Sequence, residues 1–233
     1  MRFLFAFLFC LTNLFGFGQN IPLSDFTETN LLESAKDNYY GLNSAKGFCV
    51  NNKDGKLTIT KATRSSHSEL LLPSGKLMGY NGGEWGGHLI FKSFDTTKKE
   101  IEIEQLNVKF IFSFENKIFV ISGLAHMRRS YGTLYQLDTL NDSFKIIHLI
   151  SFEDSPEAYS LYKDTLLIAS HKNFYIVHDF KKQIIIEGAM WDNLYPNSVA
   201  AFDDKHIYIG IRGGYVKLDL TTRKLTFYKY KDY

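Results

Sequence analysis

The chain has 233 residues, of which 45% are hydrophobic, 15% aromatic and 22% charged, and its formal net charge is +2. This composition excludes intrinsic disorder, collagen and coiled coils, and the length is sufficient to bury a core without disulfides or structural metals. The near balance of charge also argues against nucleic acid as a partner, because binding a polyanion requires a concentrated excess of Lys and Arg.

Residues 1–18 have the anatomy of a secretory signal peptide. Arg2 supplies the positive start, residues 3–15 form an almost unbroken apolar run, and Gly16 and Gly18 are the small residues that precede a cut. The run is shorter than the roughly 18–20 residues of a transmembrane helix, and no other segment approaches that length. We therefore expect a cleaved signal and export to the periplasm or the exterior, and the Phe-rich signal resembles those of Gram-negative bacteria. A lipoprotein anchored through Cys10 is a weaker alternative, because a bulky Phe precedes that cysteine.

A repeat of about 40–45 residues runs through the rest of the chain. Four strand-like segments end in an Asp before a polar turn, at spacings of 43, 41 and 40 residues, and these markers are Asp95, Asp138, Asp179 and Asp219. Asn52 stands in the same context one period earlier. Asp and Asn mark such turns because their side chains accept hydrogen bonds from the backbone of the turn.

Each period contains four short runs rich in Ile, Val, Phe, Tyr and Leu, which is the signature of a β-propeller blade. The chain resembles the broad β-propeller group of the YVTN and quinoprotein-like type, most closely in the segment VKLDLTTRKL. We predict an all-β fold, a β-propeller of about five four-stranded blades. The complete blades are expected at residues 67–106, 107–153, 157–190 and 197–231.

The first blade is incomplete in the sequence, because only an outer hairpin at residues 46–62 is evident. Residues 19–45 are expected to supply its inner strands or to cap the ring, and Asn30 and Glu33 have the spacing of N-cap and N3 in a short helix. Four blades with an N-terminal extension are therefore the alternative. The predicted organisation is a signal at 1–18, the segment 19–45, and one propeller domain at 46–233.

The loops of the predicted ring sort onto two faces of different chemistry. One face carries short turns rich in Lys and Asp, which are typical of solvated turns. The other carries both tryptophans, four of the seven histidines and most of the arginines, and Trp, Tyr and Arg are enriched at binding hot spots. We predict that this second face binds a partner. The candidate residues are Glu84, Trp85, His88, His126, Arg128, Arg129, Tyr131, His171, Trp191, Asp192 and Arg212.

Four of these residues lie seven or eight positions before an Asp marker: His88, Tyr131, His171 and Arg212. The pseudo-symmetry of a ring predicts that they converge at the channel mouth, unless their alignment is accidental. Trp85, between glycines, is expected either to meet a ligand or to plug the channel. Trp191 is expected either to form a carbohydrate platform or to cover the gap between two blades.

The sequence favours an exported propeller that binds a protein or glycan partner through this face, without catalysis and without a cofactor. The alternative is a hydrolase or lyase at the channel mouth, using acids such as Glu84, Asp154, Glu157 and Asp192, with or without a metal. His88, His126 and His171 are the candidate metal ligands, although no motif fixes their spacing. Nucleophile elbows, P-loops and dinucleotide fingerprints are absent. A purely structural envelope component is a third reading, and the sequence leaves the ligand and the oligomeric state open.

Overall fold

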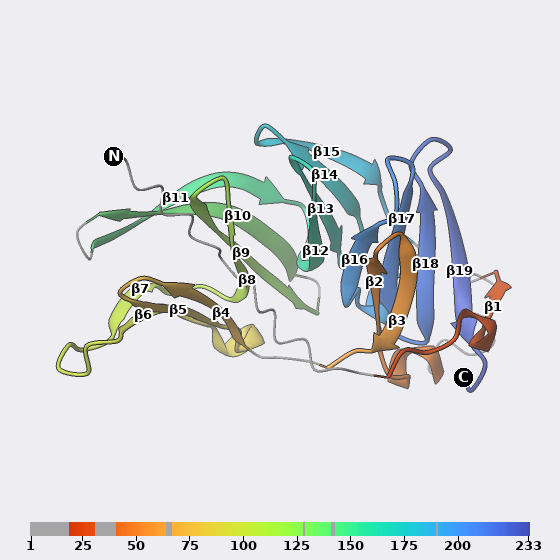
Figure 1. Ribbon diagram of the computed structural model, residues 1–233, viewed down its shortest axis with the longest axis horizontal. Coiled ribbons are helices and arrows are strands. Elements are labelled where there is room, and N and C mark those ends of the chain that lie inside the picture. Colours follow the sequence, from red (N-terminus) through yellow and green to blue (C-terminus); the bar gives the residue numbers. More distant parts are fainter. Residues whose placement is uncertain (1–18, 31–40, 64–66, 128, 141–142, 190) are drawn as a thin grey trace, which may run out of the picture.

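The computed structural model describes residues 19–30, 41–63, 67–127, 129–140, 143–189 and 191–233. Within these residues the chain forms five separate antiparallel β-sheets (Figure 1). The predicted all-β class is confirmed. The predicted signal peptide at 1–18 and the predicted N3 residue Glu33 lie outside the described residues.

Four of the sheets are each built from four strands that follow one another in the chain, and they correspond to the four predicted complete periods. The first sheet has β4 (His67–Leu72), β5 (Gly75–Tyr80), β6 (Leu89–Ser93) and β7 (Ile101–Glu104), and the second has β8 (Val108–Phe114), β9 (Lys117–His126), β10 (Arg129–Leu140) and β11 (Ser143–Phe152). The third has β12 (Pro156–Tyr162), β13 (Thr165–Ser170), β14 (Phe174–His178) and β15 (Lys181–Ile186). The fourth has β16 (Ser198–Ala201), β17 (His206–Ile211), β18 (Gly214–Asp219) and β19 (Lys224–Tyr230).

The N-terminal part of the chain adds an edge strand to the fourth sheet. After the short 3₁₀ turn η1 (Leu23–Asp25), β1 (Phe26–Thr29) pairs antiparallel with β19, and Phe26 lies opposite Tyr230. Just before η1, the backbone N–H of Ile21 donates to the carbonyl of Ile59 at 2.7 Å. Residues 19–30 thus run from the edge of the fifth sheet to the outer edge of the fourth.

The fifth sheet is a two-stranded hairpin of β2 (Phe48–Lys53) and β3 (Lys56–Lys61). The sequence predicts an outer hairpin here, but β2 packs directly on β16, β17 and β18. The reason is that Phe48 and Val50 are fully buried against Ala200 and Tyr215 of the fourth sheet. The hairpin therefore occupies an inner position, and no inner strand comes from the described part of 19–45.

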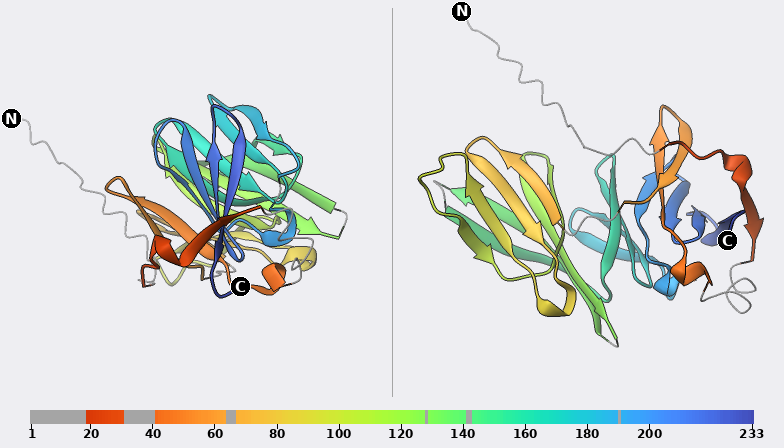
Figure 2. Two further views of the ribbon diagram at one scale, coloured as in Figure 1. Left: turned by 90° about the vertical axis from the view of Figure 1, so that its right-hand side faces the viewer. Right: turned by 90° about the horizontal axis from the view of Figure 1, so that it is seen from below.

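The sheets pack face to face in a curved row, which Figure 2 shows from two further directions. Four apolar clusters fill the successive interfaces: first sheet on second, second on third, third on fourth, and fourth on hairpin β2–β3. Among the strands of the middle sheets, β13 is covered on both faces, because five of its six residues are buried. The described chain therefore has four packed interfaces and two ends, the first sheet and the hairpin.

The first strands of four of the five sheets face one cavity. Side chains from β2, β4, β8 and β12 line one central cavity of about 620 Å³. In the part of the chain that the structure describes, no helix has the length and apolarity needed to cross a membrane.

Candidate functional site

The loop between β5 and β6 is built to project a tryptophan. The N–H of Gly82 donates to the carbonyl of Gly86 at 2.7 Å, which closes residues 82–86 around the 3₁₀ turn η2 (Gly83–Trp85). Gly86 has φ +86°, a conformation that residues with a side chain rarely adopt. A Cβ on Gly87 would lie 2.3 Å from the carbonyl oxygen of Tyr80. The glycines thus allow the tight turn that places Trp85 at its tip.

The second sheet holds this loop from the side. The side-chain N–H of Asn107 donates to the carbonyl of Gly83 at 2.8 Å. Nε2 of His126, at the end of β9, lies 2.9 Å from Oε2 of Glu84. These contacts join loop 81–88 of the first sheet to Asn107, which precedes β8, and to His126 of the β9–β10 hairpin in the second sheet.

A groove of about 410 Å³ lies between the loop and this hairpin, and we call it the loop-face groove. Trp85 stands on its rim with 87% of its surface exposed, and Tyr131 on β10 is 52% exposed. Met127, at the tip of the hairpin beside the groove residues, is 93% exposed. The lining is Trp85, Gly86, Gly87, His88, Gln105, Leu106, Asn107, Ser122, Gly123, Tyr131, Thr133 and Tyr135. Trp85 was expected either to meet a ligand or to plug the channel, and its 87% exposure contradicts the second alternative.

Two histidine–carboxylate pairs flank the groove. Nδ1 of His88 lies 2.8 Å from Oε1 of Glu102 on β7, and about half of each side chain is exposed. The hydrogen bond from His88 lowers the pKa of the Glu102 carboxyl. The Glu84–His126 pair is similarly half-exposed. Each pair is screened by solvent, so its main effect is to fix side-chain orientation around the groove.

The third sheet has a contrasting loop that is closed by a buried polar block. The carboxylate of Asp154 is 4% exposed and accepts hydrogen bonds from Ser170 Oγ, the backbone N–H groups of Lys172 and Asn173, Asn173 Nδ2 and Tyr175 Oη. Burial and the bond to Asp154 raise the pKa of the Tyr175 hydroxyl. All the acceptor capacity of Asp154 is engaged by the fold, so its predicted role as an accessible acid is wrong.

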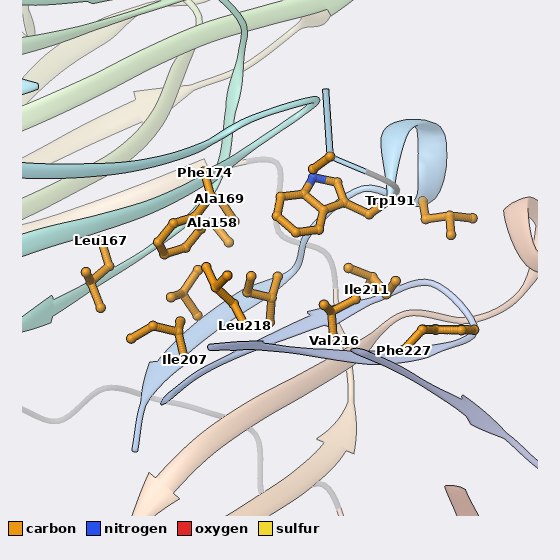
Figure 3. Close-up of a cluster of buried hydrophobic side chains, with 14 of the residues drawn as sticks. Ala158, Leu167, Ala169, Phe174, Trp191, Ile207, Ile211, Val216, Leu218 and Phe227 are labelled. Atoms are coloured by element: carbon orange, nitrogen blue, oxygen red, sulfur yellow. The ribbon is translucent and has the colours of Figure 1, made fainter. Parts of the chain in front are cut away.

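Trp191 belongs to the core rather than to the surface. Its side chain is 0% exposed and packs with Phe174 and Ile211 between the third and fourth sheets (Figure 3). Its indole N–H donates to the carbonyl of Ser170 at 3.0 Å. The predicted platform role is therefore wrong, and the alternative reading, a Trp that fills the gap between two periods, is correct. The next residue, Asp192, begins the 3₁₀ turn η3 (Asp192–Leu194) and is partly exposed.

His171 and Arg212 meet around one aromatic ring. The ring of His171 lies 5.2 Å from that of Tyr195, and the guanidinium of Arg212 lies 4.5 Å from the same ring. Nε2 of His171 is 3.4 Å from Oδ1 of Asp192. Arg212 also donates to the carbonyl and the side-chain oxygen of Asn43. These residues form a packed cluster at the junction of the third and fourth sheets.

The four aligned residues do not share one cavity. His88 and Tyr131 line the loop-face groove, whereas Arg212 lines the central cavity and His171 is largely buried beside Tyr195. The predicted convergence is therefore wrong, because the loops differ in length and burial: Tyr131 lies within β10, whereas His171 lies in a tight, buried loop.

The remaining predicted residues have simpler outcomes. Arg129 begins β10, lies opposite His126 and is exposed. Arg128 lies outside the described residues. The three candidate metal ligands are held by three different carboxylates, His88 by Glu102, His126 by Glu84 and His171 by Asp192. Where the structure describes the chain, no three His, Cys, Asp or Glu side chains come together as a metal site.

Sequence reasoning missed three residues that the structure places at cavities. Asn107 lies in the groove, and Tyr195 lies between His171 and Arg212. Lys109 and Glu157 both line the central cavity, and Nζ of Lys109 lies 2.9 Å from a carboxylate oxygen of Glu157. A lysine within the apolar run VKFIF was the available signal for the last of these, because a charge inside an inner strand needs a partner.

No protein-family model matches the chain, and no curated protein matches it. Among solved structures, the chain is similar to the crystal structure of the computationally designed Ika4 protein, with a TM-score of 0.38 and 9% identity, over 72% of this chain and 92% of that one.

Proposed function

We propose that the protein is an exported, non-catalytic binding protein of β-propeller type, related to the YVTN and quinoprotein-like group, and that its loop-face groove binds a glycan. The signal-like residues 1–18 support export. Four consecutive sheets packed in chain order support the propeller, and the first strands of three of them, β4, β8 and β12, line one central cavity.

The exposure of Trp85 is the observation that carries the proposal. An indole that is 87% exposed leaves a large apolar surface in water, and the surrounding chain is organised to keep it there. Its neighbour across the groove, Tyr131, comes from a different sheet. Two aromatic side chains brought together from separate repeats on a rigid scaffold are typical of a binding site.

The lining of the groove favours a glycan over a protein segment. Aromatic rings offer flat apolar faces to the C–H surfaces of a sugar, and amides and hydroxyls beside them match the sugar's own hydroxyls. Gln105 and Thr133 supply such polar groups. Gly86 leaves its backbone open to close approach, because no atom lies within 4 Å of the place that a Cβ would take.

Binding to an array of bacterial and host oligosaccharides tests this function, followed by calorimetric titration of the best ligand. Trp85→Ala and Tyr131→Ala are each expected to weaken binding by tenfold or more, about 1.4 kcal/mol. Phe94→Ala is the matched control, because Phe94 is 59% exposed in the turn after β6, at the opposite end of the strand from Trp85. The control is expected to bind as the unchanged protein does.

Acrylamide quenching of tryptophan fluorescence gives a second readout. Because Trp191 is buried, quenching reports on Trp85, and a bound glycan is expected to reduce it. A protein ligand that depends on Trp85 in place of any glycan would overturn the glycan assignment while keeping the groove. A ligand whose affinity is the same in both groove variants would overturn the groove itself.

Export is tested separately from binding. When the full chain is expressed in a Gram-negative host, we expect the mature protein in the periplasm or the medium, with Gln19 as its first residue. Recovery of an uncut chain from the cytoplasm would contradict this part of the proposal.

A further inference from the structure

A second pocket lies between the second and third sheets, at the opposite end of β9 from the loop-face groove. Its lining includes residues of the β8–β9, β12–β13 and β14–β15 turns, and we call it the turn-face pocket. These turns belong to the face that the sequence predicts to carry only solvated turns. The structure shows an apolar hollow among them.

The interior of the turn-face pocket is made of core side chains. Five buried residues of the apolar cluster between the two sheets line it: Phe112, Phe119, Leu134, Leu166 and Val177. The volume of the pocket is about 110 Å³. An apolar cavity of about 150 Å³ can hold a benzene molecule. The turn-face pocket therefore has the size of one hydrocarbon side chain, such as that of leucine.

Phe180 is an exposed aromatic side chain at this pocket. It is 48% exposed, and its ring centre lies 6.1 Å from that of Phe119 and 5.7 Å from Nζ of Lys117. Its φ of +55° is a conformation that a bulky residue rarely adopts and that a hairpin turn usually gives to Gly or Asn. Burial does not explain a phenyl ring that is strained and half in solvent, and strained residues of this kind cluster at ligand sites.

Acidic groups outnumber basic ones around the pocket. Among the described residues that line it, three are acids and one is a cation: Glu115, Asp164, Asp179 and Lys117. His178 lies 3.6 Å from Asp164 and 3.5 Å from Asp179, and even a protonated His178 leaves three acids against two cations. Lys163, next to Asp164 in the chain, donates to Oδ1 of Asp204 at 2.6 Å. The lining is therefore anionic in either state of His178.

We infer that the turn-face pocket binds a basic segment of a partner protein, which inserts one leucine-sized side chain and carries Lys or Arg beside it. The apolar interior takes the side chain, and the acids at the turns attract the neighbouring cations. The exposed ring of Phe180 offers its face to one of these cations. A lone amine would gain only the contacts of the pocket, whereas a polypeptide also covers the ring and the turns around it. This site is separate from the proposed glycan groove and does not depend on it.

Methyl resonances of the lining residues provide the test. In protein labelled at Leu and Val methyl groups, Leu134, Leu161, Leu166 and Val177 report on the pocket. The peptide acetyl-Gly-Lys-Leu-Lys-Gly-amide is expected to shift these resonances in a saturable way. The same peptide with Ser in place of Leu, or with Glu in place of both Lys, is expected not to do so. Binding of the Ser peptide would overturn the role of the pocket, and binding of the Glu peptide would overturn the charge match.

Removing the acids tests the electrostatic part. Glu115→Gln with Asp179→Asn is expected to weaken peptide binding by at least about fivefold, and a smaller effect is expected in about 0.5 M salt because screening weakens exposed pairs. Asp54→Asn is the matched control, because Asp54 also has a positive φ in an exposed hairpin turn and does not line the pocket. Equal binding by the double variant and the unchanged protein would overturn the proposal.

Replacing Phe180 separates binding from folding. Phe180→Gly suits the positive φ, so the melting temperature is expected to stay the same while peptide binding weakens by at least about fivefold. A lower melting temperature with unchanged binding would mean that the ring serves packing alone. Hexylamine that binds as tightly as the peptide would overturn the polypeptide partner. Trp85→Ala is expected to leave peptide binding unchanged, so failure here is distinguishable from failure of the groove.

Discussion

Loop 81–88 of the first sheet and the loops around β13, β14 and η3 contain similar residues, each with a Trp, a His and an acid, but they differ in what supports them. In the first, the glycines of the turn and one hydrogen bond from the Asn107 side-chain amide to Gly83 hold Trp85 out in solvent. In the second, the Asp154 block and the core between two sheets enclose Trp191. The residue types alone are therefore a poor guide to function. What distinguishes the two regions is whether the fold buries the indole and the nearby carboxylate or leaves them exposed to solvent.

The largest expected difference between the two regions lies in their tryptophans. Trp191→Ala removes a fully buried indole from the interface of the third and fourth sheets, and it should lower the free energy of unfolding by about 3–5 kcal/mol. Trp85→Ala should change it by no more than about 0.5 kcal/mol, because exposed side chains contribute little. Urea denaturation followed by circular dichroism measures both. Similar losses in the two variants would break the comparison.

The next effect concerns the buried carboxylate of the closed region. Asp154→Asn replaces an acceptor oxygen with an amide that faces N–H and O–H donors, and we expect a loss of about 2–3 kcal/mol in unfolding free energy. The control Asp192→Asn, at a partly exposed carboxylate, is expected to cost no more than about 1 kcal/mol. A neutral effect of Asp154→Asn would mean that the block does not stabilise the loop.

A smaller effect is expected for the ion pair of the open region. The pair of Glu84 and His126 is more than one-third exposed on both sides, so a double-mutant cycle with Glu84→Ala and His126→Ala should give a coupling of about 0–1 kcal/mol. Thermal denaturation of the four proteins measures it. A coupling of several kcal/mol would show that the loop is as tightly built as the Asp154 block.

The smallest expected effect is a change in the titration of Glu102. Because His88 holds the pKa of this carboxyl below its ordinary value, His88→Ala should raise it, as measured by NMR of the side-chain carboxyl carbon. A carboxyl whose pKa is lower in the folded than in the unfolded protein stabilises the fold at pH values above its ordinary pKa. This stabilisation is lost as the pH falls through the lowered pKa of the folded state. The His88→Ala variant should therefore show a slightly weaker dependence of stability on pH in the acid range. An unchanged pKa would mean that His88 does not contact Glu102 in solution.

The repeat could be predicted from the sequence because its signal is local. Asp95, for example, accepts hydrogen bonds from the backbone N–H and the hydroxyl of Thr97. Asp219 accepts them from the backbone N–H groups of Thr221 and Thr222. Such turns form within a few residues, so their spacing reveals the order of strands. The four-stranded sheets followed from that order.

Features that depend on distant residues could not be predicted. The burial of Trp191 requires the fourth sheet, and the inner position of hairpin β2–β3 requires the contact of Phe48 with residues more than 150 positions away. The equivalence of His88 and Arg212 in the repeat holds along the chain, but the row of sheets places them at different cavities. The position of a residue in the repeat therefore predicts well which strand or loop it belongs to. It predicts poorly which other residues surround it in the fold.

The pairing of β1 with β19 has a consequence for the order of folding. Phe26 lies opposite Tyr230, so the edge of the fourth sheet joins residues from opposite ends of the sequence. Contacts of such high sequence separation form late, because the long intervening chain must first be ordered. Until then β19 is an open strand edge that can pair with another chain. We therefore expect the short strand β1 to cover this edge late in folding and to keep it from pairing with another chain.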